Sequence, residues 1–262
     1  MLSVIVITRN EAHQLARCLG SVAAIADEMV VVDSASSDGT PALARELGAR
    51  VIETLDWPGF GVQKQRALDA VRGDWVLALD ADEWLGTQLA SRIAQVMAQP
   101  WDAATQPAGY VLMRLSAFCG QWMRGGDWYP DPVLRLVRRE RARFTADRVH
   151  ERLQVEGRTE RFAGLLLHDS IPTLESGLDK ANRYSTGRAA DLAARGRRGG
   201  LGSAIAHGLW AFLRTYVLRG GFRDGRLGVA LAVLNAETTY YRYLKMWLAD
   251  PGRRPLPPPP EA

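Results

Sequence analysis

Cysteine is scarce in this chain, which contains two cysteines among 262 residues. So few cysteines exclude the disulfide framework of a small secreted domain. Free cysteine is among the most often buried residues, so we expect Cys18 and Cys119 to be small packing side chains in a reduced, cytoplasmic protein. The first residues, Leu2–Thr8, are typical of a strand and lack the charged leader and cleavage site of a signal peptide.

Long apolar runs are absent as well. A membrane-spanning helix needs about 18–20 consecutive apolar residues. The nearest candidate, residues 201–218, is interrupted by His207 and Arg214. We therefore expect no transmembrane helix.

Basic charge is concentrated in one segment. The net charge of the chain is +4, whereas residues 188–226 hold eight arginines against two aspartates, a net +6. Aromatic and aliphatic side chains are interleaved with these arginines, which suits an anionic membrane surface. The alternative is a helical pair packed on the rest of the protein with its arginines in water. No nucleic-acid-binding motif is present, so we expect no nucleic-acid partner.

Two phosphate-binding motifs are also missing. No G-x-G-x-x-G follows the first predicted strand, and no G-x-x-x-x-G-K-[ST] occurs anywhere in the chain. These absences argue against a nicotinamide-dependent enzyme and against a P-loop nucleotide triphosphatase. The first strand ends instead in Thr8-Arg9-Asn10-Glu11 and leads to a predicted helix, whose N-terminus favours anions.

The first half of the chain alternates strand and helix patterns. Continuous apolar runs such as Val30–Val32 and Trp75–Leu79 are typical of parallel strands covered on both faces. Thr40 and Pro41 are typical of an N-cap followed by proline at the first helical position. The alternation predicts a doubly wound α/β domain. The predicted strands are residues 3–8, 29–33, 50–53, 75–80 and 109–115.

The second half is less regular and then helical. Helices are predicted over residues 173–194, 203–218 and 226–248, and the proline-rich residues 251–262 are expected to be disordered or extended. We therefore expect a catalytic α/β domain over residues 1–170, a helical extension over 171–250, and a tail over 251–262.

Polar residues follow three of the predicted strands at their carboxyl ends. In α/β sheets ligands bind outside this edge, so Thr8-Arg9-Asn10, Asp33 and Asp80-Ala81-Asp82 should converge there. Two carboxylates at this spacing can face one Mg²⁺ or Mn²⁺ ion. A solvated acidic turn is the alternative interpretation. Asp33 can accept from a ribose hydroxyl or a base N–H.

Three motifs together resemble glycosyltransferase family 2, which has the GT-A fold. They are Ser3-Val-Ile-Val-Ile-Thr-Arg-Asn-Glu11, Val30-Val-Val-Asp-Ser-Ala-Ser-Ser-Asp-Gly-Thr40 and Leu77-Ala-Leu-Asp-Ala-Asp-Glu83. Further motifs resemble the branch that includes lipopolysaccharide core β-glucosyltransferases. These are Gly126–Asp131, Leu134-Arg-Leu136 and Val149-His-Glu151.

The resemblance implies a role for each matching residue. Asp80 would contact the ribose, and Asp82 would bind a divalent metal, Mg²⁺ or Mn²⁺, that bridges the diphosphate of a UDP-sugar donor. His150 or His168 could be a further metal ligand, with a structural histidine as the alternative in each case. The remaining donor-binding residues would be Thr8, Arg9, Glu11, Asp33 and Lys64.

An inverting transferase also needs a base for the acceptor hydroxyl, and a carboxylate is the natural choice. Glu151 is the favoured candidate, with Asp131 and Asp127 as alternatives. Glu151 could instead pair with Arg148 or Arg152 on the surface. Trp122 and Trp128 could stack on an acceptor sugar or serve as packing residues.

These expectations combine into one function. We expect an inverting, non-processive transferase that moves a hexose to a cell-envelope saccharide, with the lipopolysaccharide inner core as the leading acceptor. The acceptor would be lipid-linked, and the enzyme would lie peripherally on the inner face of the inner membrane. The alternatives are a polyprenyl-phosphate sugar transferase and a non-catalytic nucleotide-sugar-binding protein of the same fold.

Overall fold

The computed structural model describes residues 1–145 and 151–250, which form two compact units. The first unit comprises Met1–Ser116 and Pro130–Asp169. The second unit comprises Ala117–Tyr129 and the chain from Ser170 onward. The chain therefore crosses the boundary between the units three times, after Ser116, Tyr129 and Asp169. The three functional segments expected from the sequence stay a prediction, and the tail over 251–262 lies outside the described residues.

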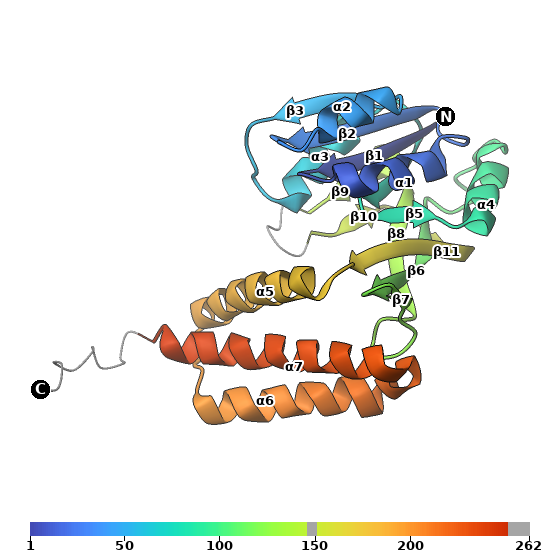
Figure 1. Cartoon of the computed structure of the whole chain (residues 1–262). Helices are drawn as coiled ribbons and strands as arrows, with labels where there is room; N and C mark the ends of the chain where they lie inside the picture. Colours follow the sequence, from blue (N-terminus) through green and yellow to red (C-terminus); the bar gives the residue numbers. More distant parts are fainter. Residues whose placement is uncertain (146–150, 251–262) are drawn as a thin grey trace, which may run out of the picture. The chain divides into compact units, whose positions relative to one another are not determined.

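A mixed sheet forms the centre of the first unit (Figure 1). Its strand order is β3-β2-β1-β4-β8-β6-β11-β5, with β7 paired to β6. The four strands from β3 to β4 are parallel, as predicted, whereas β8 runs antiparallel to β4 and to β6. The strands are β1 (Leu2–Thr8), β2 (Glu28–Ser34), β3 (Arg50–Thr54), β4 (Trp75–Asp80), β5 (Glu83–Leu85), β6 (Gly109–Phe118), β7 (Gln121–Trp122), β8 (Asp131–Arg138) and β11 (Thr159–Ile171). A separate ribbon pairs β9 (Ala142–Phe144) with β10 (Leu153–Val155).

Helices cover both faces of the parallel strands. All seven residues of β1 are buried, which explains why its sequence does not alternate between apolar and polar residues. One apolar cluster contains Leu15 of α1 and Leu89 of α4, and the cluster on the other side of the strands contains Leu68 of α3. The helices of this unit are α1 (Ala12–Val22), α2 (Thr40–Glu46), α3 (Phe60–Ala70) and α4 (Thr87–Met97), with a short turn η1 at Arg139–Arg141.

The predicted N-cap of α2 is wrong. Gly39, with φ of 87°, holds the N-cap position, and no side chain caps the helix. The Thr40 hydroxyl accepts a hydrogen bond from the Glu11 amide at 2.9 Å and donates to the Asp38 carboxylate. Thr40 therefore fixes the loop after β1, a long-range contact that helix signals in the sequence do not contain.

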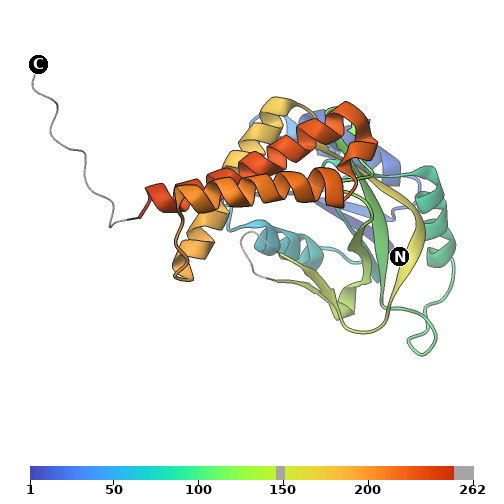
Figure 2. The same ribbon diagram turned by 90° about the horizontal axis from the view of Figure 1, so that it is seen from below.

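Three long helices form most of the second unit. In this unit α7 packs against both α5 and α6, and α6 and α7 run side by side in opposite directions (Figures 1 and 2). Their small core includes Met123, Ala181 and Leu231. The elements are α5 (Leu174–Ala194), α6 (Leu201–Leu213), the π-helical turn η2 (Arg214–Leu218), the 3₁₀ turn η3 (Gly221–Asp224) and α7 (Gly225–Leu248). None of the described helices has the length and apolar character needed to cross a membrane.

The cysteine expectation is half correct. Cys18 is buried, and burial together with the nearby Glu83, Asp82 and Asp80 carboxylates raises its thiol pKa well above the ordinary value. Cys119 is only partly buried and has a positive φ of 48°, because it lies in the turn between β6 and β7.

Candidate functional site

The predicted convergence of three strand ends is confirmed. Strand β1 lies between β2 and β4, and the register places Thr8 beside Asp33 and Ile7 beside Asp80. The Thr8 hydroxyl donates to Asp33 at 2.7 Å. The carboxyl ends of these parallel strands therefore form one polar edge of the first unit.

Asp33 is held entirely by protein groups. Its side chain is 0% exposed and accepts hydrogen bonds from Thr8 Oγ1, from the Ser36 amide at 2.9 Å and from Ser36 Oγ at 2.6 Å. A buried carboxylate that accepts several hydrogen bonds fixes the loop that donates them. Its contact with a base or ribose stays a prediction.

The loop after β1 is fixed against the loop after β2. Asn10 has a left-handed backbone, with φ of 60°, and its amide donates to Ser36 Oγ at 2.7 Å. The Asn10 side chain accepts from the Ser37 amide at 2.8 Å. Arg9 is exposed and Glu11 is partly buried at this edge. Both remain candidates for nucleotide contact.

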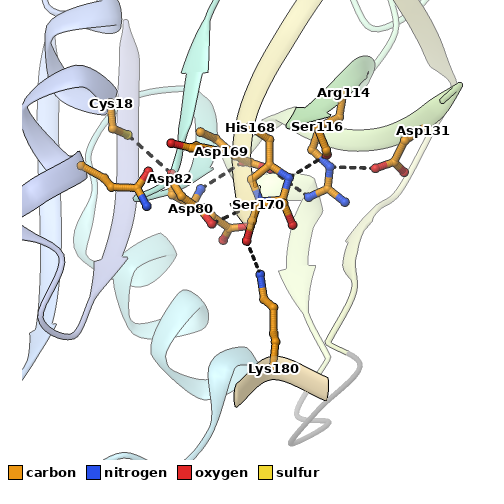
Figure 3. Close-up of polar contacts among 12 residues, drawn as sticks. Cys18, Asp80, Asp82, Arg114, Ser116, Asp131, His168, Asp169, Ser170 and Lys180 are labelled. Atoms are coloured by element: carbon orange, nitrogen blue, oxygen red, sulfur yellow. Dashed lines mark hydrogen bonds and ion pairs between the residues drawn. The ribbon is translucent and has the colours of Figure 1, made fainter. Parts of the chain in front are cut away.

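The two aspartates after β4 have different surroundings. Asp80 is bound by two cations, Lys64 Nζ at 2.8 Å and Arg135 Nη2 at 2.6 Å. Asp82 contacts His168 Nε2 at 3.2 Å, and His168 Nδ1 lies 2.8 Å from Ser116 Oγ (Figure 3). Two positively charged side chains therefore neutralise Asp80, whereas the Asp82 carboxylate contacts only a histidine side chain among the described residues.

A chain of seven side chains with alternating charge runs through the first unit. Each neighbouring pair in this charge chain lies between 2.6 and 3.0 Å apart. Figure 3 shows its Arg114–Asp131 end and the position of Asp80. Its members, in order, are Glu151, Lys64, Asp80, Arg135, Glu83, Arg114 and Asp131.

In the charge chain, burial and mutual attraction shift the pKa values in opposite directions, and the attraction has the larger effect. Burial alone would raise the pKa of Asp80, but the charges of Arg135 and Lys64 hold that pKa well below its usual range. Burial would lower the pKa of Arg135 and of Lys64, but the neighbouring carboxylates raise both. All three groups are therefore charged near neutral pH, and their mutual attraction offsets the cost of burying each charge.

Glu83 and Arg135 form the centre of the charge chain, and neither was predicted as a site residue. Glu83 is 0% exposed; its Oε1 accepts from Arg135 and Arg114, and its Oε2 accepts from the Asp80 amide at 3.0 Å. The signal for Arg135 is one charged residue inside the otherwise apolar run Val133–Val137. Its partners could not be identified because they depend on the antiparallel pairing of β8 with β4 and β6.

Two of the three candidate bases lie at the ends of the charge chain. Glu151 contacts Lys64 Nζ at 3.0 Å, and no ion pair joins it to Arg152. The other predicted surface partner, Arg148, lies outside the described residues. Asp131 contacts Arg114 Nε at 2.8 Å. Asp127 belongs to the second unit and contacts Arg219 at 3.2 Å. The identity of the base stays a prediction.

The residues around Asp82 fit a divalent cation that a substrate helps to hold. In residues 1–145 and 151–250, no group of three His, Cys, Asp or Glu side chains could bind a metal without help. Asp82 offers carboxylate oxygen and His168 offers an imidazole nitrogen beside it. Mg²⁺ and Mn²⁺ are commonly bound by one or two protein ligands plus phosphate oxygens. His150 lies outside the described residues.

The two predicted acceptor tryptophans belong to the second unit. Trp122 is 40% exposed at the end of β7. Trp128 packs edge-on against Phe118, with ring centroids 6.2 Å apart. Their contact with an acceptor stays a prediction.

Comparison with known proteins identifies relatives over nearly the full chain. Residues 3–118 match the family model of glycosyl transferase family 2. An uncharacterised glycosyltransferase of Rickettsia typhi is 30% identical over 94% of this chain and 86% of its own. The lipopolysaccharide core biosynthesis glycosyltransferase LpsC of Rhizobium meliloti is 30% identical over 92% of this chain and 93% of its own.

A solved structure supports the same assignment at the level of the fold. The mannosyltransferase PcManGT from Pyrobaculum calidifontis, in complex with GDP-mannose and Mn²⁺, has a TM-score of 0.53. It is 17% identical to this chain and matches 95% of this chain and 88% of its own. The chain therefore belongs to glycosyl transferase family 2 and is a glycosyltransferase with the GT-A fold.

Proposed function

We propose that this enzyme transfers one hexose, with inversion, from a UDP-sugar to a saccharide of the cell envelope, with the lipopolysaccharide inner core as the acceptor. The similarity to LpsC over 92% of this chain carries the acceptor class. The polar edge at the ends of β1, β2 and β4 supplies the donor site. Thr8, Arg9, Glu11 and Asp33 would surround the nucleoside there.

Lys64 and Arg135 position the donor-side carboxylate. They hold Asp80 from both sides, so its orientation toward the ribose is fixed before the donor arrives. Asp82 and His168 would hold the divalent ion together with the donor diphosphate. When bound, the ion supplies Lewis-acid stabilisation of the charge that develops on the departing nucleoside diphosphate.

Glu151 is the proposed general base. It would take the proton of the acceptor hydroxyl as that oxygen bonds to the anomeric carbon and the bond from this carbon to the diphosphate breaks. Lys64 binds Oε1 of Glu151 and Oδ1 of Asp80, so one ammonium group links the base to the donor side of the site.

The second unit supplies the proposed contact with the membrane. Five exposed aliphatic side chains recur every four residues along α6 and η2, so they share one helix face. Exposed arginines stand before and after this apolar face, at positions 197, 198, 219 and 223. Apolar side chains flanked by arginines suit an anionic leaflet. The five residues are Leu201, Ile205, Leu209, Leu213 and Val217.

Co-sedimentation with vesicles tests the membrane contact. Vesicles of phosphatidylglycerol and phosphatidylcholine should bind the enzyme, and the double change Leu209→Glu and Leu213→Glu should abolish binding. The matched control is Leu55→Glu, because Leu55 is 97% exposed in the first unit. Equal binding of all three proteins would refute the contact.

A nucleotide panel tests the donor. Unfolding temperature is measured with uridine, guanosine and cytidine diphosphates and their sugars, with and without Mn²⁺. Stabilisation by UDP that requires Mn²⁺ is the expected result, and the best UDP-sugar is then assayed for transfer. Transfer to inner-core oligosaccharide supports the proposed acceptor. Transfer to polyprenyl phosphate alone would replace it.

A further inference from the structure

A cavity of about 250 Å³ lies within the second unit. Its wall is formed by the loop over 126–128, by the end of α6 with η2, and by one face of α7. Sites for drug-sized ligands usually measure about 300–1,000 Å³, so this cavity suits one small chemical group. No residue of the charge chain belongs to its wall.

The wall carries positive charge without a matching carboxylate. Arg214 and Arg242 both line the cavity, and among the described residues neither has an acidic partner within ion-pair distance. The acid on the wall, Asp127, is paired with Arg219 at 3.2 Å. An anion that entered the cavity would therefore meet two unpaired guanidinium groups.

Arg242 is held under conditions that are unfavourable for a cation. Its Nε is buried and has no hydrogen-bond partner among residues 1–145 and 151–250. Burial, with the charges of Arg188 and Arg214, lowers the pKa of its guanidinium despite the nearby Tyr243. A guanidinium whose charge is opposed by burial and by two like charges gains when an anion binds beside it.

The remaining wall offers groups that bind a sugar. Thr238 and Thr239 donate their hydroxyl protons to backbone oxygens of α7 at 2.7 and 2.9 Å, and their oxygens can still accept hydrogen bonds. Asn235 supplies an amide, and Trp128 an aromatic ring. Together with the two arginines these groups match a sugar that bears a negative charge.

The loop on one side of the cavity is held by hydrogen bonds and a close backbone contact. The Asp224 carboxylate accepts from the amides of Arg124 and Gly125 at 3.0 and 2.7 Å. A Cβ on Gly125 would lie 2.3 Å from the Gly220 carbonyl oxygen, so only glycine permits this approach. Asp127 has φ of 70°, a left-handed conformation that costs a non-glycine residue energy and is common at functional sites.

We propose that this cavity binds the anionic group, phosphate or carboxylate, of the saccharide acceptor through Arg214 and Arg242. This inference rests on the proposed function, because it assigns the cavity to the acceptor of that reaction. The enzyme would then select acceptors by a charged sugar within them, whichever hexose it adds.

Calorimetric titration of the full chain tests the proposal with four soluble probes: glucose 6-phosphate, glucuronate, glucose and inorganic phosphate. The charged sugars should bind, more weakly as ionic strength rises, and glucose should bind at least about tenfold less tightly. Inorganic phosphate should bind less tightly than glucose 6-phosphate, because it makes no contact with Trp128. Equal binding of glucose and glucose 6-phosphate would overturn the proposal.

Variants assign the binding to the cavity. Arg214→Gln and Arg242→Gln should each weaken glucose 6-phosphate binding at least about tenfold, and Arg242→Lys should weaken it less. Arg226→Gln is the matched control, because Arg226 lies on α7 with Arg242 but does not line the cavity. Unfolding temperatures verify that each variant folds. Unchanged affinity in folded Arg214→Gln and Arg242→Gln would overturn the proposal.

Two further measurements separate this proposal from its rivals. If anionic vesicles bind through these arginines while no soluble charged sugar binds, the cavity is a lipid headgroup site and the acceptor assignment is wrong. UDP binding with Mn²⁺ is measured on the same variants and should be unchanged. If the wild type does not bind UDP in the presence of Mn²⁺, the donor proposal is wrong. The titration with glucose 6-phosphate tests the cavity separately, because it needs no donor.

Discussion

Two groups of charged side chains, one in each unit, are organised in opposite ways. In the first unit, seven side chains from Glu151 to Asp131 alternate in sign, and each lies within 3.0 Å of its neighbour. In the second unit, Arg214 and Arg242 share a cavity without an acidic partner among the described residues. Paired charges fix geometry in advance of a ligand, whereas unpaired charges gain most when a ligand arrives.

The largest effect should come from Asp82, whose side chain at the polar edge contacts His168 and no lysine or arginine among the described residues. Asp82→Ala should reduce transfer by at least about a thousandfold, because the divalent ion contributes several kcal/mol to the transition state. The unfolding temperature without metal should change little. Asp74→Ala is the control, since Asp74 precedes the opposite end of the same strand, and it should retain full activity. A metal-independent, active Asp82→Ala enzyme would refute the mechanism.

Removing a cation from the charge chain should cost stability. Arg135→Met leaves Asp80 and the fully buried Glu83 without their shared partner, and breaking such a buried pair costs about 3–5 kcal/mol. Arg45→Met removes a pair between exposed side chains and should cost less than about 1 kcal/mol. Urea denaturation measures both. Similar decreases in the free energy of unfolding for both variants would mean that the charge chain stabilises the fold no more than a surface ion pair does.

The two ends of the charge chain should differ in catalysis. Glu151→Gln should lower kcat by at least about 100-fold with little change in the affinity for UDP, because it removes the proton acceptor and keeps the shape of the side chain. Asp131→Asn should lower kcat less. The reverse order would assign the base to Asp131. If neither variant has a lower kcat, Asp127 in the second unit becomes the candidate base.

The smallest effect concerns pH. Asp80 has a lowered pKa, so its contribution to stability is complete above its unfolded pKa of about 3.9 and is lost as the pH falls through the folded value. Lys64 has a raised pKa, so its contribution is complete below about pH 10.4 and is lost above the folded value. The difference in unfolding free energy between wild type and Asp80→Asn should therefore be constant from about pH 5 to about pH 9. It should begin to shrink only below about pH 4. A steep change near neutral pH would contradict this assignment.

Local patterns in the sequence were sufficient for the parallel strands and their polar ends. The runs Val30–Val32 and Trp75–Leu79 predicted buried strands, and the strand ends after β1, β2 and β4 do meet. The helix predicted over residues 173–194 is α5, which begins at Leu174 behind a capping box formed by Thr173 and Ser176. In each case the signal lies within a few residues of the feature that it predicts.

Features that depend on long-range pairing could not be predicted in the same way. The meeting of Arg135 with Asp80 and Glu83 depends on β8 running antiparallel to β4, and the cavity depends on a loop near residue 126 meeting α7. The predicted helix over 203–218 shows the same limit locally. It begins at Leu201, and its last five residues, Arg214–Leu218, form a π-helical turn that places Arg214 on the cavity wall.

The second unit is assembled from two stretches of chain with 40 residues of the first unit between them. Met123, on the earlier stretch, is 0% exposed and packs with Ala181 of α5 and Leu231 of α7. During synthesis this side chain leaves the ribosome about a hundred residues before its α7 partner, which is several seconds at about 5–20 residues per second. Met123 therefore lacks its α7 partner while the emerged chain already contains all the strands of the first unit, and the C-terminal helices complete the core around it.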